Sequence, residues 1–472
     1  MDVNLCSVLI QVFFELRPAF SRLRTAQWAA LVVLGFCIRR ETAGVTSFVR
    51  AFGLKPKCYQ ALLDSFSSSA VKLDTLNQIW LKLCLKIFTP VTVQGRMVLA
   101  CDGIKAPKEG RRMPSVKLCH QSSTNNSKPE FIMAHSMQML SLLVEGFGKK
   151  ISAVLLSARI HEGLVFSNRD HRTLLDKMNA MVASTLSHEK QGFLLVADAY
   201  YSSAALLDSI ASQNGALLVR VRNNVVGFLP AIPSKKPTRG RPKKYGKRVE
   251  IFDLFKSRTT DFVTIPSPIR DESGVTTRYL VIDLLWKQLK NKVRFILSDH
   301  PTRGQCILMT NDWDLKPEEA IRLYHARFGI EMSFKALVHT VGGFDYHFWM
   351  KDMDKLKRGD GDQYLHRKEA KYREKVKAKV NTYHVFVNLA VIAQGILCYL
   401  SIAHKDHVWQ SFGAWMRTIR KDLAPSEAVT SEALRESLSE YLKSNDDPLS
   451  FKKFLRGKSK SGGAMSHELK AA

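Results

Sequence analysis

The sequence predicts an α+β protein in which helices flank a mixed β-sheet. Residues 1–92 carry apolar stretches without the alternation that marks a strand, which indicates a helical region. Short apolar runs recur from Met97 onward, with helical stretches between several of them, which indicates buried strands. The length of 472 residues suggests two to four domains or one large core with insertions. The hydrophobic content of 45% is typical of a chain that folds.

The charge balance predicts a polyanionic partner. There are 71 basic against 43 acidic residues, a formal charge of +28, so double-stranded DNA is the first expectation and a membrane surface is the rival. The one long apolar run, residues 385–403, is interrupted by Asn388, Gln394 and Gly395, which favours a buried helix over a membrane span. We therefore expect no membrane partner.

The N-terminus and the cysteines predict a cytoplasmic protein. The first residues lack the basic segment that opens a signal peptide. The eight cysteines form no Cys-x-x-Cys pair, so we expect reduced thiols in the core and no zinc site.

Within residues 1–92, five helical stretches are expected, two short and three longer. Two short ones around Gly53, within residues 41–66, resemble a helix-turn-helix. Two interpretations stay open for this pair, either contact with DNA or simple packing in a helical bundle. The longer stretches are residues 9–20, 26–38 and 71–88.

Two apolar runs farther along each end in an aspartate. The run from Met97 ends in Asp102-Gly103, and the run from Gly192 ends in Asp198. Two strands of one sheet can place such residues side by side. The other strands that we expect in this half are residues 135–144, 150–156 and 216–220, the first two forming a meander with the Asp102 strand, and the expected helices are residues 171–186 and 202–212.

Residues 221–290 interrupt this pattern with a basic loop. Residues 235–248 hold eight cations and no acid, and proline and glycine prevent a helix there. The Arg-Gly-Arg-Pro sequence within it is similar to arms that enter the DNA minor groove, while a solubilising loop is the alternative. The candidate DNA contacts are Arg239, Arg241, Lys243 and Lys244, and short strands follow at residues 278–283, 293–297 and 306–310.

A helix is expected from Pro317 to the glycines at 342 and 343. Pro317 suits the first turn, Glu318 and Glu319 suit its positive end, and Asp314 is a plausible cap. At 100° per residue, one face carries Tyr324, Arg327, Glu331 and Lys335. This face is either a solvated row of ion pairs or, since Phe328 and Phe334 add bulk beside it, the rim of a core where a carboxylate has a function.

Asp102, Asp198 and Glu331 together predict a metal site. Three clustered carboxylates repel one another unless cations lie between them. Oxygen ligands select Mg²⁺ or Mn²⁺, and two such ions commonly support the cutting and joining of phosphodiesters. The sequence therefore predicts that these three acids are catalytic and bind two Mg²⁺ ions, for which Mn²⁺ can substitute.

Three blocks resemble the DDE transposases of bacterial insertion sequences, specifically the insertion-sequence-four family. They are Leu99–Gly103, Val196–Tyr201 and the pattern Tyr324-x-x-Arg327-x-x-x-Glu331, within a resemblance that covers about residues 95–400. The family pattern ends in a lysine seven residues after the glutamate. This sequence has Val338 at that position, and the nearest lysine, Lys335, lies on the right face of the helix to substitute for it. The aromatic run at residues 346–349 is also similar.

The resemblance implies a ribonuclease-H-like core with a β-rich insertion. The corresponding division is a helical DNA-binding region 1–92, core segments 93–220 and 291–404, the insertion 221–290 and a helical C-terminal region 405–472. It also implies nicking at element ends, a hairpin intermediate, strand transfer into target DNA, and a homodimer that joins two ends in the bacterial cytoplasm. Tyr324, Arg327 and Lys335 would contact DNA phosphates.

Two other functions remain open from the sequence. One is a DNA-binding protein that keeps this fold without catalysis, against which the three intact acids argue. The other is a ribonuclease-H-like nuclease that cuts without joining.

Overall fold

The core of the protein is a five-stranded mixed sheet. The computed structural model describes residues 3–121, 129–232, 243–445 and 447–460. β2 (Arg96–Pro107), β4 (Phe131–Glu145) and β5 (Ile151–Ile160) form an antiparallel meander, and β7 (Phe193–Ala197) and β8 (Gly215–Val221) lie parallel to β2. The order β5-β4-β2-β7-β8, with α6 (Leu174–Leu186) and α7 (Ala204–Ser212) as the crossovers, is ribonuclease-H-like. The predicted fold class is confirmed.

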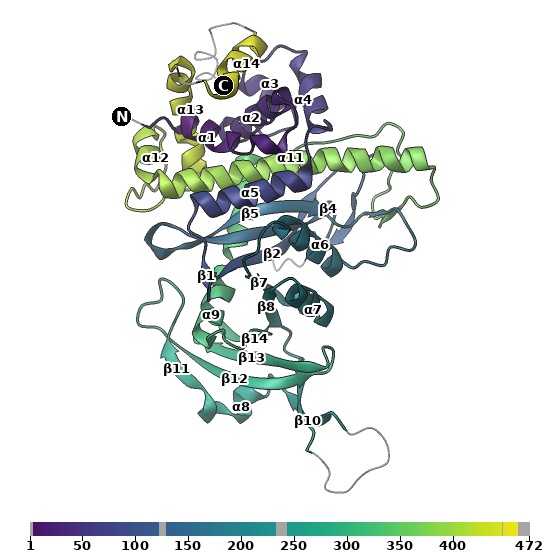
Figure 1. Cartoon of the computed structure of the whole chain (residues 1–472), viewed down its shortest axis with the longest axis vertical. Helices are drawn as coiled ribbons and strands as arrows, with labels where there is room; N and C mark the ends of the chain where they lie inside the picture. The colour runs from purple at the N-terminus through teal and green to yellow at the C-terminus, as the bar shows by residue number, and fades with distance from the viewer. Residues whose placement is uncertain (1–2, 122–128, 233–242, 446, 461–472) are drawn as a thin grey trace.

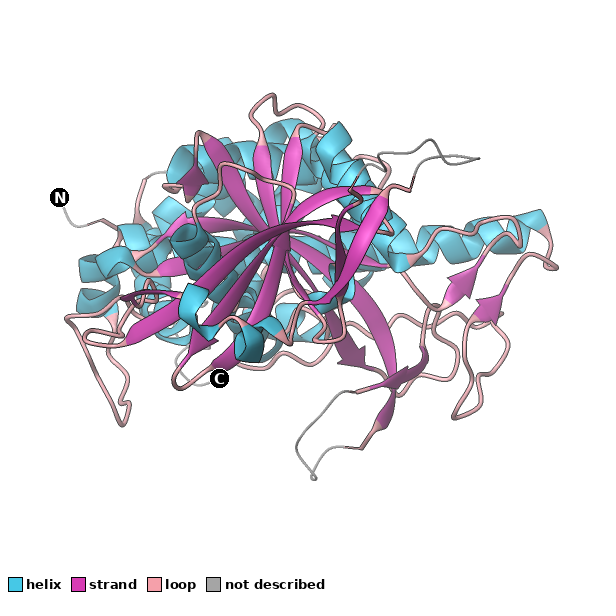
Figure 2. Ribbon diagram, turned by 90° about the horizontal axis from the view of Figure 1, so that it is seen from below, coloured by secondary structure: helices cyan, strands magenta, loops and turns pink. Residues whose placement is uncertain are grey.

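The sheet does not stop at β8. β14 (Gly304–Thr310), β13 (Asn291–His300) and β12 (Thr276–Trp286) add to it in antiparallel order, followed by β9 (Val226–Pro230) and β10 (Tyr245–Glu250). The longer strands of the predicted insertion, β9, β10 and β12, are therefore joined to the core sheet through β13 and β14 rather than forming a sheet of their own. They make the lower half of Figure 1, and Figure 2 shows the strong twist of the continuous sheet. The small elements at its margins are β1 (Thr92–Val93), β3 (Lys117–His120), β11 (Val263–Pro266) and α8 (Leu254–Ser257), while β6 (Leu164–Val165) pairs with β15 (Gln363–Tyr364).

Helices from both ends of the chain form a layer above the core sheet (Figure 1). The longest, α11 (Ala370–Ala403), begins 15 residues before the predicted apolar run and lies along β5. It is long and apolar enough to cross a membrane, but 89% of its apolar window is buried, as the sequence predicted. The other helices of the layer are α1 (Leu5–Phe14), α2 (Leu23–Ile38), α3 (Thr46–Ala51), α4 (Cys58–Phe66), α5 (Leu73–Ile87), α12 (Lys405–Ser411), α13 (Glu427–Lys443) and α14 (Phe451–Lys458).

A polar residue in α11 explains one interruption of the apolar run. The side chain of Asn388 accepts a hydrogen bond from Ala158 N at 3.0 Å and donates one to Ala158 O at 2.9 Å. The amide therefore satisfies backbone groups of β5, the outer strand of the core meander, which would otherwise be buried without partners.

The two short helices predicted around Gly53 are present in the structure. These helices, α3 and α4, bury Phe48, Leu62 and Phe66 in the core, which agrees with the packing interpretation of the pair; contact with DNA stays a prediction.

All eight cysteines are free, and seven of them are buried. Such thiols behave as small apolar residues.

Candidate active site

Asp102 and Asp198 lie next to each other on adjacent parallel strands. β2 pairs with β7 at a constant offset of 96 residues, from Met97–Phe193 to Ala100–Val196. Asp198 follows Asp102 by the same 96 residues, so the two acids continue this register just beyond the last pair. One expectation was wrong. Asp102 is not at the tip of its strand, because β2 continues against β4 as far as Pro107.

A short network fixes the turn that carries Asp198. The carboxylate accepts a hydrogen bond from Tyr200 N at 3.0 Å, which caps a 3-10 turn over residues 199–201. The buried Tyr201 hydroxyl accepts from Gln138 Nε2 at 3.0 Å, and Gln138 Oε1 accepts from His161 Nδ1 at 2.5 Å. β4 and β5 thus hold the backbone of Asp198 in place.

The helix that carries Glu331 is broken, which the sequence did not predict. α9 (Pro317–Ala326) and α10 (Gly329–Ala336) are separate, and a π-helical turn over residues 337–341 follows. Near the break, Phe328, Ile330 and Glu331 donate to carbonyls three residues back, so the chain tightens locally. Pro317 does open α9 and Gly342, at φ 67°, does end the segment, but the expected cap Asp314 was wrong because Lys316 holds that position.

The Arg327 guanidinium lies between Asp102 and Glu331. Arg327 Nη1 donates to Asp102 Oδ2 at 2.7 Å, and Nη2 donates to Glu331 Oε1 at 3.5 Å. The Arg327 side chain is only 12% exposed and that of Asp102 19%, whereas that of Glu331 is 45% exposed. The expected pair on the helix surface is therefore the weaker contact, and the ion pair across to β2 is the stronger one.

The charges of the three acids influence one another. Burial raises the pKa of Asp102 to about 6, although the Arg327 guanidinium and Gly103 N–H lower it, and the charges of Asp198 and Glu331 raise it further. Burial lowers the pKa of Arg327, but the nearby carboxylates raise it by more, so its pKa is above the ordinary value. Arg327 therefore stays charged and balances part of the negative charge.

The donor chemistry suits a hard divalent cation. The carboxylates of Asp102 and Glu331 contact one cationic group, Arg327, and that of Asp198 is near enough to act on its charge; oxygen donors of this kind bind Mg²⁺ or Mn²⁺. Among the residues that the structure describes, no three His, Cys, Asp or Glu side chains are close enough to hold an ion together.

The remaining predicted DNA contacts have different surroundings. Tyr324 is half-buried with Arg327 5.8 Å from its ring, and Lys335 is exposed on α10. Val338, where the family pattern places a lysine, is packed against the core. Of the basic loop, Lys243 and Lys244 are exposed, and Lys244 Nζ donates to Lys290 O; Arg239 and Arg241 lie outside the described residues.

A cavity of about 680 Å³ is lined in part by Arg327, the residue that contacts Asp102 and Glu331, and we call it the Arg327 cavity. It lies between the α9–α10 break, the start of β5 and loops of the insertion. Burial, and then the charge of Arg303, lower the pKa of His325 in its wall to about 4, so this histidine adds no positive charge at neutral pH. The charged residues of the lining are five cations and one acid, namely Lys150, Arg270, Arg303, Arg322, Arg327 and Asp271.

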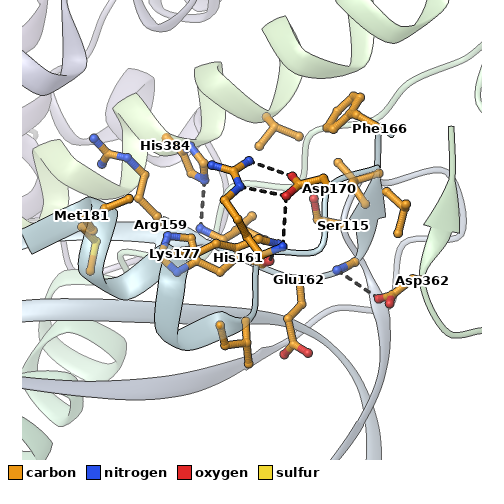
Figure 3. A pocket seen from close by; sticks show the side chains of 18 of the residues that line it. Ser115, Arg159, His161, Glu162, Phe166, Asp170, Lys177, Met181, Asp362 and His384 are labelled. Atoms are coloured by element: carbon orange, nitrogen blue, oxygen red, sulfur yellow. Dashed lines mark hydrogen bonds and ion pairs between the residues drawn. The ribbon is translucent and has the colours of Figure 1, made fainter. Parts of the chain in front are cut away.

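A second cavity, of about 690 Å³, lies beyond His161 and is called the Asp170 cavity (Figure 3). Its cations are matched by acids or carbonyls. Arg172 pairs with Asp170 at 2.7 Å, Arg159 pairs with Asp74 at 2.9 Å, and Lys177 donates to the His161 carbonyl at 2.6 Å. None of the predicted catalytic or DNA-binding residues lines it.

Sequence reasoning missed two features of this site, the hydrogen-bond network behind Asp198 and the cations that line the Arg327 cavity. Gln138 and His161 gave no signal, because the first is one polar residue inside a largely apolar strand and the second directly follows the end of another. The four cations that join Arg327 around its cavity come from four separate segments, and nothing in the chain order indicated that they meet.

The chain belongs to the DDE superfamily endonucleases. The family model of that description matches residues 15–270, more than half of the chain, and includes Asp102 and Asp198 but not Glu331. The chain is also similar to a piggyBac transposase, solved by cryo-EM as a synaptic complex with hairpin DNA, at 10% identity and a TM-score of 0.40 over 99% of this chain and 86% of that one. No curated protein matches the sequence.

Proposed function

We propose that this endonuclease is a transposase that cleaves DNA at the ends of a mobile element and transfers the strand into target DNA. The observation that carries the proposal is the joint placement of Asp102, Asp198 and Glu331 around one cationic group. The family, DDE superfamily endonucleases, and the formal charge of +28 support the same substrate.

In this proposal Asp102, Asp198 and Glu331 are catalytic residues that hold two Mg²⁺ ions, with Mn²⁺ as a substitute. When bound, such ions activate the attacking oxygen and stabilise the leaving one. The chain itself fixes Asp198 through the Tyr201 and Gln138 hydrogen bond, and it fixes Asp102 Oδ1 through Gly103 N at 2.7 Å. These contacts orient the oxygens before the substrate arrives.

Residues around the acids would hold the DNA backbone. The planar fork of Arg327 suits a phosphate, Tyr324 can donate a hydrogen bond, and Lys335 would act in place of the lysine missing at Val338. Lys243 and Lys244, with Arg239 and Arg241, would contact the duplex at a distance from the cleaved bond.

The finer steps follow the insertion-sequence-four resemblance. We propose a hairpin intermediate on the element end and a homodimer that brings two ends together. The three acids alone would explain DNA cleavage, and these two steps are added to explain how the cleaved ends are joined to target DNA.

The test uses DNA that carries the sequences flanking the reading frame, incubated with the full chain and Mg²⁺. We expect inverted repeats there, nicks at their ends, a crosslinked strand on denaturing gels and joined products. Nicking without joined products would favour a nuclease without strand transfer. Binding without cleavage in Mg²⁺ or Mn²⁺ would contradict the proposal and favour a non-catalytic DNA-binding protein.

A further inference from the structure

Arg327 places a positive charge between two of the three acids, Asp102 and Glu331. Its Nη1 atom lies 2.7 Å from Asp102 Oδ2, and its Nη2 atom lies 3.5 Å from Glu331 Oε1. The Nε atom is buried and has no hydrogen-bond partner among the described residues. The two acids are thus the groups to which the guanidinium donates.

Both oxygens of Asp102 are engaged while this contact holds. Oδ1 accepts from Gly103 N at 2.7 Å and Oδ2 accepts from Arg327. Since an arginine cannot lose its charge, a divalent cation at Oδ2 would be repelled by the guanidinium, and it would bind more tightly once the guanidinium moves away.

The Arg327 cavity offers the guanidinium another position. Arg327 is part of the cavity wall, together with Lys150, Arg270, Arg303 and Arg322. A DNA phosphate attracted by these cations would arrive beside the guanidinium, which binds phosphate through two parallel hydrogen bonds. Movement of one side chain would then replace the carboxylate with a phosphate as its partner.

We propose that Arg327 is an exchangeable counter-ion that couples DNA binding to metal binding. Without DNA it neutralises Asp102 and opposes the divalent cation; with DNA it turns to a phosphate and frees Asp102 Oδ2. The inference rests on the proposed function, because it takes DNA and a divalent cation as the ligands. The coupling is reciprocal, so the cation also strengthens DNA binding.

The first experiment titrates the full chain, free of DNA, with Mn²⁺ and measures bound ion by electron paramagnetic resonance. We expect Arg327→Gln to bind Mn²⁺ at least about fivefold more tightly than wild type, the lower end of ordinary coupling between sites. The gain should vanish when Asp102→Asn is added. Equal affinity in Arg327→Gln and wild type, or a gain that survives Asp102→Asn, would overturn the proposal.

Arg322→Gln is the matched control. Arg322 lines the same cavity and pairs with an acid of its own helix, Glu319, but it does not contact Asp102. Its removal should leave Mn²⁺ affinity without DNA unchanged. A gain as large as that of Arg327→Gln would mean that net charge in the cavity, and not the contact with Asp102, opposes the ion.

A second measurement does not depend on the variant folding. Wild type saturated with a duplex of the flanking DNA should bind Mn²⁺ at least about fivefold more tightly than wild type alone, after ions bound by the DNA are subtracted. No gain would overturn the proposal. Neither titration depends on DNA cleavage. If the chain never cuts DNA but shows both gains in Mn²⁺ affinity, the proposed function is refuted while this inference stands.

Discussion

The two cavities are nearly equal in volume, 690 and 680 Å³, but they differ in the net charge of the residues that line them. In the Asp170 cavity each cation has a partner, and burial first, with neighbouring cations second, lowers the pKa of His161 to about 3 and that of His384 well below its usual value. The lining of the Asp170 cavity holds three cations and four acids, whereas the lining of the Arg327 cavity holds five cations and one acid, although four of those cations, all but Lys150, also pair with an acid. Size therefore does not distinguish the two cavities, whereas the surplus positive charge beside the acids that we propose to be catalytic favours the Arg327 cavity as the DNA site.

The largest expected effect is on DNA cleavage, and it should distinguish the three proposed catalytic acids from Asp170 of the other cavity. Asp198→Asn should lower Mg²⁺-dependent cleavage about 10³-fold or more, because a lost ligand removes several kcal/mol and each 1.36 kcal/mol is tenfold. Asp170→Asn, which removes an acid of the other cavity, should leave the rate within about twofold. Single-turnover cleavage of end DNA measures both, and similar losses from Asp102→Ala and Glu331→Ala are expected. Near-normal cleavage by any of the three would remove that residue from the site.

The next effect concerns the basic loop, which could hold the DNA instead of either cavity. Neutralising Arg239, Arg241, Lys243 and Lys244 should reduce the slope of log K against log salt by up to about 3.6, at roughly 0.9 per phosphate contact. Binding to end DNA is measured in EDTA at several salt concentrations. An unchanged slope would make the loop a solubilising feature and leave the cavity as the main contact.

A smaller change is expected from the rim of the Arg327 cavity. Arg270→Gln with Arg303→Gln should reduce the same slope by about 1.8, since two contacts are lost. The control is Arg258→Gln with Arg278→Gln, which lie outside the cavity. Arg303 and Arg278 are matched, because each pairs with an acid and their side chains are 47% and 46% exposed. Equal slopes for the two double variants would place the DNA elsewhere.

The smallest effect is a pH dependence of stability at Glu272, which holds Arg303 at 2.8 Å. Burial opposes the shift, but hydrogen bonds from Ser267, Arg303 and His300 lower the pKa of Glu272 to about 2, below its usual 4.5. Its contribution is therefore full above pH 4.5 and is lost as the pH falls from 4.5 towards 2. Urea unfolding from pH 6 to 3 should show a steeper loss for wild type than for Glu272→Gln. Parallel curves would contradict this account.

The strand half of the site was accessible from the sequence. Apolar runs that end at Asp102 and Asp198 predicted two buried strands, and the parallel register places the two acids together. The sequence alone did not show that 96 residues is also the pairing offset, because register depends on how β2, β4 and β7 pack.

The helix half was only partly accessible. The face that carries Arg327 and Glu331 was predicted, but its geometry depends on the break between α9 and α10. A Cβ added at Gly329 would lie 3.4 Å from Ala153 N, so α10 packs closely on β5 at this residue. A glycine inside a helical pattern was the one signal of this feature in the sequence. The partner of Arg327 could not be predicted, because Asp102 is 225 residues away.

The most direct test of the central claim is a crystal structure of the chain bound to end DNA and Mn²⁺, with anomalous data. We expect manganese peaks among Asp102, Asp198 and Glu331, with Arg327 withdrawn from Asp102 and bound to a DNA phosphate. Manganese at another site, or an Arg327–Asp102 ion pair that remains intact with DNA and metal bound, would contradict the account.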